Sequence, residues 1–141
     1  MNTESPMHQM TDEEAWAFLG SHEFGRLAFH LAGEVHITPI NYCADRGRLI
    51  FRTAEGNKLL GVTMNQDVAF EVDEFTETEA TSVVLRGFAQ TLEGDEADFA
   101  DELPLRPWVP TEKHVVIAVT PSEMSGRRFD LQRPWLHQRT D

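Results

Sequence analysis

The feature that most constrains the fold is a succession of six short stretches with the residue pattern of β-strands. They lie near residues 25–31, 35–42, 49–53, 68–73, 83–88 and 115–119. Most alternate apolar with small or polar residues, which indicates a strand with one buried face, and the last is a continuous β-branched run typical of a fully buried strand. Short turns and only two or three helical stretches separate them. This pattern predicts an antiparallel barrel rather than a sheet in which strands and helices alternate.

Turn and helix signals fall between these strands. Glycine-containing turns are expected at residues 32–33 and 45–48. The first helix is expected over residues 11–21, because Thr11 and Glu14 form a capping box. Further helices are expected over residues 56–65 and 95–103. The predicted fold is therefore mainly β, with six antiparallel strands and two or three short helices.

The length and charge of the chain limit its domain organisation and its partners. At 141 residues it suits one domain, predicted over residues 11–141 after a flexible N-terminus of residues 1–10. A net charge of -12 argues against nucleic-acid binding and against docking on an anionic membrane. No apolar run is long enough to span a bilayer. The single cysteine, Cys43, excludes an internal disulfide and favours a cytoplasmic protein.

One segment of this acidic chain has the chemistry of an anion site. Residues 51–59, FRTAEGNKL, follow a predicted strand and enter a predicted helix. A phosphate is held by helix N-terminal N–H groups, hydroxyls and cationic side chains. This segment supplies donors of all three kinds, at Arg52, Thr53, Asn57 and Lys58. The alternative is that the two cations are solvated and pair with Glu55. The glycine fingerprints of P-loop and Rossmann sites are absent.

The order of the segments resembles one known family. A helix, GRLAF, a hairpin with a TPIN strand, LIFRT, GNKL, VAFEVD and a VxLRG strand follow one another between about Trp16 and Phe129. This succession is similar to the pyridoxamine 5′-phosphate oxidase-like family, whose fold is the FMN-binding split β-barrel. The pattern FRTxxGxK is closest to the small actinobacterial-type branch of that family.

The resemblance implies a set of FMN-binding residues. The strand that runs along the flavin in the family corresponds to His36, Ile37, Thr38, Pro39, Ile40 and Asn41. The phosphate contacts correspond to Arg52, Thr53, Asn57 and Lys58, and a side chain near the flavin corresponds to Ser82. The oxidase proper has cationic residues where this chain has His36, Asn41 and Asn57, so the phosphate would be held by fewer charges. In the family a homodimer encloses the cofactor.

The implied function is that of an FMN-dependent oxidoreductase acting on an unidentified small molecule, with no catalytic side chain named. The alternatives are a non-catalytic barrel that carries flavin, deazaflavin or haem, and a structural dimer in which residues 51–59 are only a turn. Trp135, in a basic and aromatic tail, is a candidate for covering the flavin or the dimer seam, with plain packing over the barrel end as the alternative.

Three other candidates have simpler interpretations. His30 and His36 flank a turn and lack further metal ligands nearby, so a surface or half-buried pair is favoured over a metal site. Cys43 lies on a predicted strand and is favoured as a core residue. Glu71 and Asp73 point to one side of a strand, which favours the wet face of a barrel over a pair of catalytic carboxylates.

Overall fold

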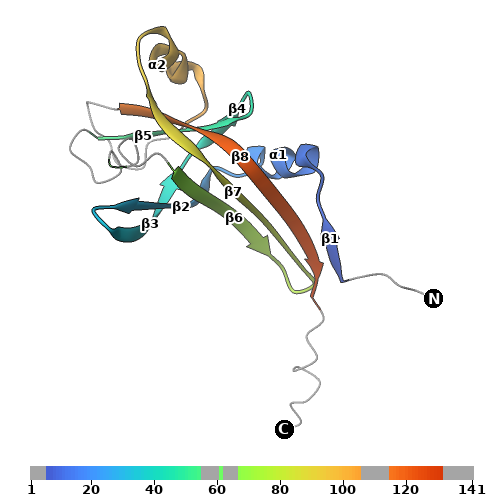
Figure 1. Cartoon of the computed structure of the whole chain (residues 1–141). Coiled ribbons are helices and arrows are strands. Elements are labelled where there is room, and N and C mark those ends of the chain that lie inside the picture. The colour runs from blue at the N-terminus through green and yellow to red at the C-terminus, as the bar shows by residue number, and fades with distance from the viewer. Residues whose placement is uncertain (1–5, 55–60, 62–66, 106–114, 132–141) are drawn as a thin grey trace.

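The structure is a computed structural model of the chain, and it describes residues 6–54, 61, 67–105 and 115–131. The described part is one strongly curled antiparallel sheet with two helices and a short 3-10 turn (Figure 1). The elements in chain order are β1 (Met7–Gln9), α1 (Asp12–Gly20), β2 (Phe24–Leu31), β3 (Glu34–Asn41), β4 (Cys43–Asp45), β5 (Arg48–Thr53), β6 (Asp67–Phe75), β7 (Glu79–Leu92), α2 (Asp95–Phe99), η2 (Ala100–Glu102) and β8 (Val115–Asp130).

The order of the strands shows how the sheet curls into a barrel. Neighbouring strands follow the order β3-β2-β6-β7-β8-β5-β4, and β1 pairs with the far end of β8. The two edge strands, β3 and β4, are consecutive in the chain and are separated only by Tyr42. One bent stretch of chain therefore pairs with β2 through its first half and with β5 through its second half. Both ends of the sheet order are joined covalently at this bend.

The strand count differs from the predicted six for two identifiable reasons. The sheet contains eight strands, because the chain continues past the bend at Tyr42 as a further short strand, β4, and because β1 is added. β1 lies within residues 1–10, where a flexible N-terminus was predicted. Its three residues instead pair with Arg127, Arg128 and Phe129 of β8. Three residues are too few to show a period, and their pairing partner lies more than a hundred residues away in the sequence.

Both predicted turns have the backbone that two-residue hairpins require. Ala32 and Gly33 connect β2 to β3, and Arg46 and Gly47 connect β4 to β5. All four residues have positive φ, at 54°, 81°, 51° and 76° in that order. Positive φ at both central positions twists a turn in the same sense as the strands it joins. The registers of β2 on β3 and of β4 on β5 are set by these turns.

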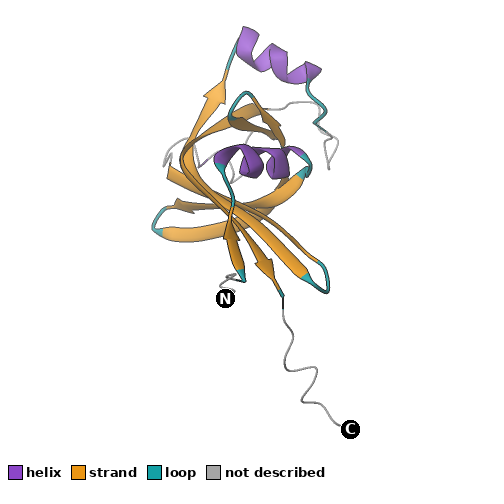
Figure 2. Ribbon diagram, turned by 90° about the vertical axis from the view of Figure 1, so that its right-hand side faces the viewer, coloured by secondary structure: helices purple, strands orange, loops and turns teal. Residues whose placement is uncertain are grey.

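Helix α1 lies inside the curve of the sheet and completes its main core (Figure 2). The predicted capping box is present: the Glu14 amide donates to the Thr11 hydroxyl at 3.1 Å, and the Thr11 amide donates to the Glu14 carboxylate at 2.9 Å. The bond from the Thr11 amide to the carboxylate lowers the pKa of Glu14. Ala15 and Leu19 then face the core, packed with inward residues of the sheet.

A second, smaller core lies on the opposite side of the sheet under α2 and η2. It is formed by Ile50, Leu92, Ala100, Val116 and Ala118. Strand β5 is consequently buried on both faces, since Leu49 and Phe51 point into the main core and Ile50 into the small one. The predicted helix of residues 95–103 is confirmed as α2 followed by η2. The predicted helix of residues 56–65 lies outside the described residues, apart from Gly61.

Candidate functional site

Strand β5 ends at two residues that were predicted to contact one phosphate, and their side chains leave opposite faces of the strand. Thr53 follows Leu49 and Phe51 on the face toward the main core, and it is 5% exposed. Its hydroxyl has no hydrogen-bond partner among the described residues. A buried hydroxyl without a partner is uncommon, because leaving it unpaired costs about 1–3 kcal/mol. Thr53 therefore has a donor and acceptor available for a ligand at the carboxyl end of β5.

The Arg52 side chain points to the other face, toward α2 and η2. Its guanidinium donates to the Asp101 carboxylate at 2.7 Å, and its side chain is 21% exposed. Two further arginines of the β4–β5 hairpin contact the same segment. The contacts are Arg48 with Glu96 at 3.8 Å and Arg46 over the Phe99 ring at 4.5 Å. The basic residues of this hairpin thus attach the acidic α2–η2 segment to the barrel, and the sequence does not show this, because the partners are about fifty residues apart.

The predicted flavin strand corresponds to β3, an edge strand of the described sheet. His36, Thr38 and Ile40 face inward, opposite Phe29, Leu27 and Gly25 of β2. The His36 ring stacks on the Phe29 ring with centroids 5.3 Å apart. Ile37 and Pro39 face outward and are exposed, and Asn41 ends the strand. One side of the β3 backbone pairs with β2, and no other described strand pairs with it.

The two histidines near the β2–β3 turn do not form a metal site. His30 pairs with Val35, and His36 pairs with Phe29, so the two imidazoles lie on opposite faces of the sheet. Within the described ranges, no group of three or more His, Cys, Asp or Glu side chains has the arrangement of a metal site.

Ser82 lies far from Thr53 within one chain. Ser82 pairs with Arg127 near the end of β8, whereas Thr53 pairs with Val115 at its beginning. Twelve residues of extended strand correspond to about 40 Å. A single chain therefore does not bring these two predicted contacts to one ligand. Asn57, Lys58 and Trp135, the remaining predicted contacts, lie outside the described residues.

The outer face of the sheet near Ser82 carries a small charged network. The Arg26 guanidinium donates to Glu71 at 2.7 Å and to Asp73 at 3.1 Å. Partial burial, and then the neighbouring Asp73 carboxylate, raise the pKa of Glu71, although Arg26 acts in the opposite direction. The predicted wet face is confirmed for these two carboxylates, which Arg26 holds together.

A groove of about 400 Å³ opens beside this network, at the end of the β6–β7 hairpin. Its apolar surface comes from Phe75, Ala80, Phe129 and Leu131. Glu71, Asp73 and Glu74 supply carboxylates, and Thr81 and Ser82 supply hydroxyls. Apart from Ser82, no residue of this groove was predicted to bind a ligand, because its three walls come from separate parts of the chain.

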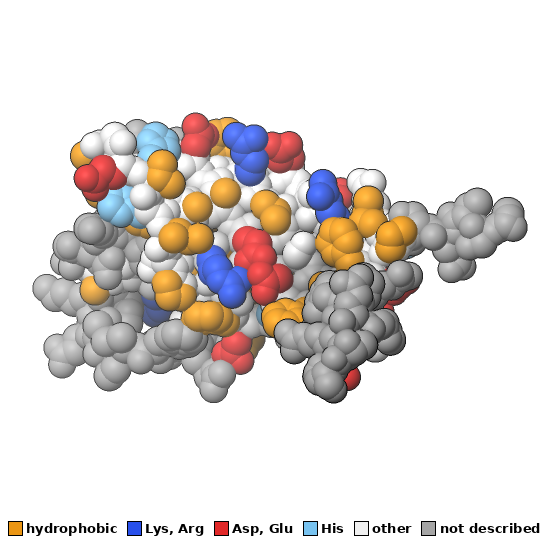
Figure 3. All heavy atoms as spheres, turned by 90° about the horizontal axis from the view of Figure 1, so that it is seen from below, with side chains coloured by type: hydrophobic (Ala, Val, Ile, Leu, Met, Phe, Trp, Pro, Cys, Tyr) orange, Lys and Arg blue, Asp and Glu red, His pale blue; other side chains and the backbone are white. Residues whose placement is uncertain are grey.

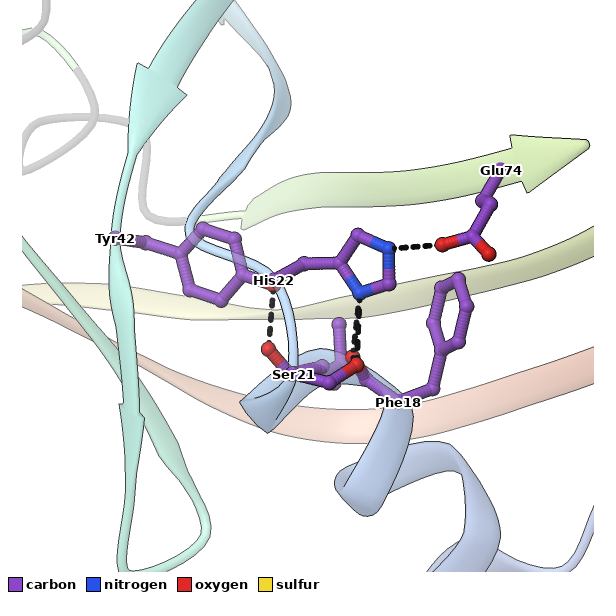
Figure 4. Close-up of polar contacts among 6 residues, drawn as sticks. Phe18, Ser21, His22, Tyr42 and Glu74 are labelled. Carbon is purple, nitrogen blue, oxygen red and sulfur yellow. Dashed lines mark hydrogen bonds and ion pairs between the residues drawn. The ribbon is translucent and has the colours of Figure 1, made fainter.

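His22 ties one wall of the groove to helix α1 (Figure 4). Its Nε2 lies 2.7 Å from a Glu74 carboxylate oxygen. Its Nδ1 lies 2.9 Å from both the Phe18 carbonyl and the Ser21 hydroxyl. In the same region the buried Tyr42 hydroxyl donates to the Leu19 carbonyl at 2.6 Å. The last turn of α1 is thereby attached to β6 and to the bend between β3 and β4.

Comparison with known proteins identifies the family. A sequence model of the family described as pyridoxamine 5′-phosphate oxidase matches residues 11–128. The chain belongs to this family. Its fold is also that of related structures, which confirms the predicted split β-barrel.

Three related proteins show how similar this chain is to other sequences and structures. A crystal structure from Corynebacterium glutamicum is 35% identical with a TM-score of 0.82, covering 94% of this chain and 100% of that one. A protein from Mycobacterium smegmatis, described as an FAD binding protein, is 33% identical with a TM-score of 0.80, covering 89% and 100%. An uncharacterised protein of Mycobacterium tuberculosis is 31% identical over 128 residues, which are 86% of this chain and 84% of the relative.

Proposed function

We propose that this chain is an FMN-binding flavoprotein that holds the cofactor phosphate at the carboxyl end of β5. The observation that carries the proposal is the buried Thr53 hydroxyl, which has no partner among the described residues and lies at the start of the segment with the chemistry of an anion site. A phosphate oxygen is a suitable acceptor for this hydroxyl. Asn57 and Lys58 would supply the amide and the ammonium group, and the helix expected from residue 56 would supply backbone N–H groups.

Arg52 has a different role in this proposal from the one that the family resemblance implies. Its 2.7 Å ion pair with Asp101 occupies the guanidinium on the face opposite Thr53. The phosphate would then be held by one cationic side chain of this segment, Lys58, rather than by two. Charged hydrogen bonds contribute about 1.5–3 kcal/mol each. We therefore expect this chain to hold FMN less tightly than a site with several arginines would.

Strand β3 would contact the flavin ring in this proposal. As an edge strand it presents backbone N–H and C=O groups along the side that does not face β2. Such groups can hydrogen-bond to the polar edge of an isoalloxazine ring. The bound flavin would supply the hydride or electron transfer, as flavin cofactors do. The residues from His36 to Asn41 would orient the ring.

A homodimer would enclose the cofactor. The outer face of the sheet carries apolar side chains that are exposed to water in a single chain (Figure 3). They are Val35 at 84% exposure, Ile37 at 69%, Phe88 at 52% and Val84 at 42%. Exposed apolar side chains interspersed with charged ones, as on this face, are compatible with a protein–protein interface.

The relatives support flavin binding, but they do not decide whether the flavin is FMN or FAD, which carries an additional adenylate group. The M. smegmatis relative is described as FAD-binding, and FMN and FAD share the ring, the ribityl chain and the first phosphate. The contacts proposed here all address that shared part. We propose FMN because the anion-binding segment is short and needs one phosphate only. Tighter binding of FAD than of FMN would contradict that choice while leaving the flavin site intact.

The test is a flavin titration of the purified protein and of one lysine variant. The parent should take up FMN with quenched flavin fluorescence and retain visible flavin absorbance through gel filtration. Lys58→Ala should weaken binding by about tenfold to a hundredfold, the equivalent of about 1.5–3 kcal/mol. Arg128→Ala, which removes a cation near the opposite end of β8 from the partner of Thr53, is the control and should bind like the parent. A protein that ignores both FMN and FAD would refute the proposal, and a Soret band would indicate haem instead.

We further propose that the flavoprotein is an oxidoreductase on a small molecule in the cytoplasm. The alternative, a non-catalytic flavin carrier, is favoured by the Arg52–Asp101 pair, since weaker retention suits a cofactor that is delivered and exchanged. Anaerobic mixing with a nicotinamide donor distinguishes the two. An oxidoreductase should bleach the flavin band and recover it on addition of an electron acceptor, whereas a carrier should release FMN without being reduced.

A further inference from the structure

The surface of the groove at the end of the β6–β7 hairpin indicates what kind of side chain would fill it. Phe75 forms part of its apolar surface and is 72% exposed, although large aromatic side chains are usually covered. Phe129 and Leu131 lie beside it, at the end of β8. Because the groove combines an exposed aromatic ring with other apolar side chains, its occupant should itself carry a large apolar side chain.

The charge around the groove selects a cationic occupant. Arg26 is shared between Glu71 and Asp73, so one positive charge serves two carboxylates. Glu74 faces the imidazole of His22. Arg127 lies opposite Ser82 on the same outer face and adds one positive charge. The carboxylates therefore exceed the permanent positive charges along this wall.

An excess of negative charge continues at the end of the sheet. Glu79 and Asp130 are direct cross-strand neighbours on β7 and β8. Neither carboxylate has an ion-pair partner among the described residues. Like charges directly opposite each other destabilise a sheet, and a cation placed beside them removes that cost.

We propose that this groove is the docking site for the C-terminal segment of the same chain, residues 132–141. The segment follows Leu131, which itself lines the groove and whose amide donates to the Thr78 carbonyl at 2.8 Å. Its sequence, QRPWLHQRTD, contains two arginines and the adjacent pair Trp135 and Leu136. In an acidic chain, this local combination of aromatic, aliphatic and basic side chains matches the apolar surface and carboxylates of the groove.

The connection is short enough for docking within one chain. Trp135 follows Leu131 by four residues, so the chain must reverse direction to return its side chain to the groove. Pro134 favours such a reversal, because proline is preferred at the second position of type I and type II turns. Arg133 would then lie near Glu79 and Asp130, and Trp135 would cover Phe75. This assignment gives Trp135 a role away from the cofactor, and it does not depend on the proposed flavin site.

The test measures the environment of Trp135 in the full chain. The fluorescence of the Trp135→Phe variant is subtracted from that of the parent, and the difference is compared with a synthetic peptide of residues 132–141. Docking predicts that Trp135 emits at shorter wavelength and is quenched less by acrylamide than the tryptophan of the peptide. Phe75→Ser should abolish both effects. Val35→Ser is the matched control, since it also removes an exposed apolar side chain, and it should leave them unchanged.

Two further measurements separate the possible occupants. Arg133→Glu should move Trp135 toward the emission of the peptide, and circular dichroism checks that each variant keeps its sheet. This arm keeps the proposal testable if Phe75→Ser does not fold. Trp135 emission equal to that of the peptide in the parent would overturn the proposal. A blue shift that persists in both Phe75→Ser and Arg133→Glu would also overturn it. A blue shift that disappears on dilution would overturn it too, because it would indicate that the segment of a second copy fills the groove.

Discussion

The Thr53→Val substitution tests the proposed phosphate site through two effects of opposite sign. Valine has nearly the shape of threonine but no hydroxyl, so the substitution removes a buried polar group that has no partner among the described residues. An unpaired buried hydroxyl costs about 1–3 kcal/mol, which the apo protein should recover in part. For a chain near this size, each kcal/mol raises the melting temperature by roughly 2–4 °C. The apo variant should therefore melt a few degrees above the parent.

The same substitution should weaken FMN binding. A hydrogen bond from Thr53 to a charged phosphate is expected to contribute about 1.5–3 kcal/mol, so the dissociation constant should rise about tenfold to a hundredfold. Because a bound ligand raises the melting temperature of any protein, the stability measurement must use flavin-free protein. Differential scanning calorimetry of the apo form and a fluorescence titration with FMN supply the two numbers.

The control and the contradicting result are both well defined. Thr81→Val makes the same change at the other buried threonine of the described chain, at the far end of the sheet. It should leave FMN affinity unchanged. If Thr53→Val destabilises the apo protein and binds FMN like the parent, then the hydroxyl has an ordinary structural partner. The phosphate site would then have to be sought elsewhere.

Three more substitutions test the fold around the site. Tyr42→Phe leaves the Leu19 carbonyl without its buried donor and should lower the free energy of unfolding by about 1–3 kcal/mol in denaturant titrations, with the same fold by circular dichroism. Gly87→Ala places a methyl group against the Thr120 backbone carbonyl at the β7–β8 bulge and should cost about 1–3 kcal/mol or more, whereas a neutral result would show that the bulge relaxes freely. Glu71 has a raised pKa in the folded state, so its contribution to stability is present below the ordinary Glu pKa and is lost as pH rises through the folded value. Unfolding free energies measured from acid to neutral pH should consequently decline less in Glu71→Gln than in the parent, and parallel curves would contradict the assignment.

Much of the fold follows from local sequence patterns. The capping box of α1 and the turns at residues 32–33 and 45–48 depend on neighbouring residues only, and the structure confirms each of them. The buried run of β8 from Val116 to Val119 is likewise confirmed. These features are predictable because propensity, periodicity and turn chemistry act over a few residues.

None of the described helices is both long and apolar enough to cross a bilayer.

The remaining features depend on contacts between distant parts of the chain. Arg52 was assigned to a phosphate as a cation of the anion-site segment and through the family resemblance. Alternation along β5 sends its side chain to the face opposite Thr53, where Asp101 is its partner. A strand buried on one face is recognised by alternation, whereas the small core under α2 buries the second face of β5 as well. The link between His22 and Glu74 spans 52 residues. Periodicity carries no information about such partners.

The covalent join between β3 and β4 affects how readily two copies of this protein can exchange strands. An open sheet has two free edges, and each can accept a strand from another molecule. Here Tyr42 links the two ends of the strand order, so β3 and β4 belong to one continuous segment, and each keeps one side that pairs with no other described strand. Exchange of β3 and β4 between two copies would break both ladders together, because one bent segment supplies both. The fold should therefore resist strand-swapped dimers, and this resistance arises from connectivity rather than from charge.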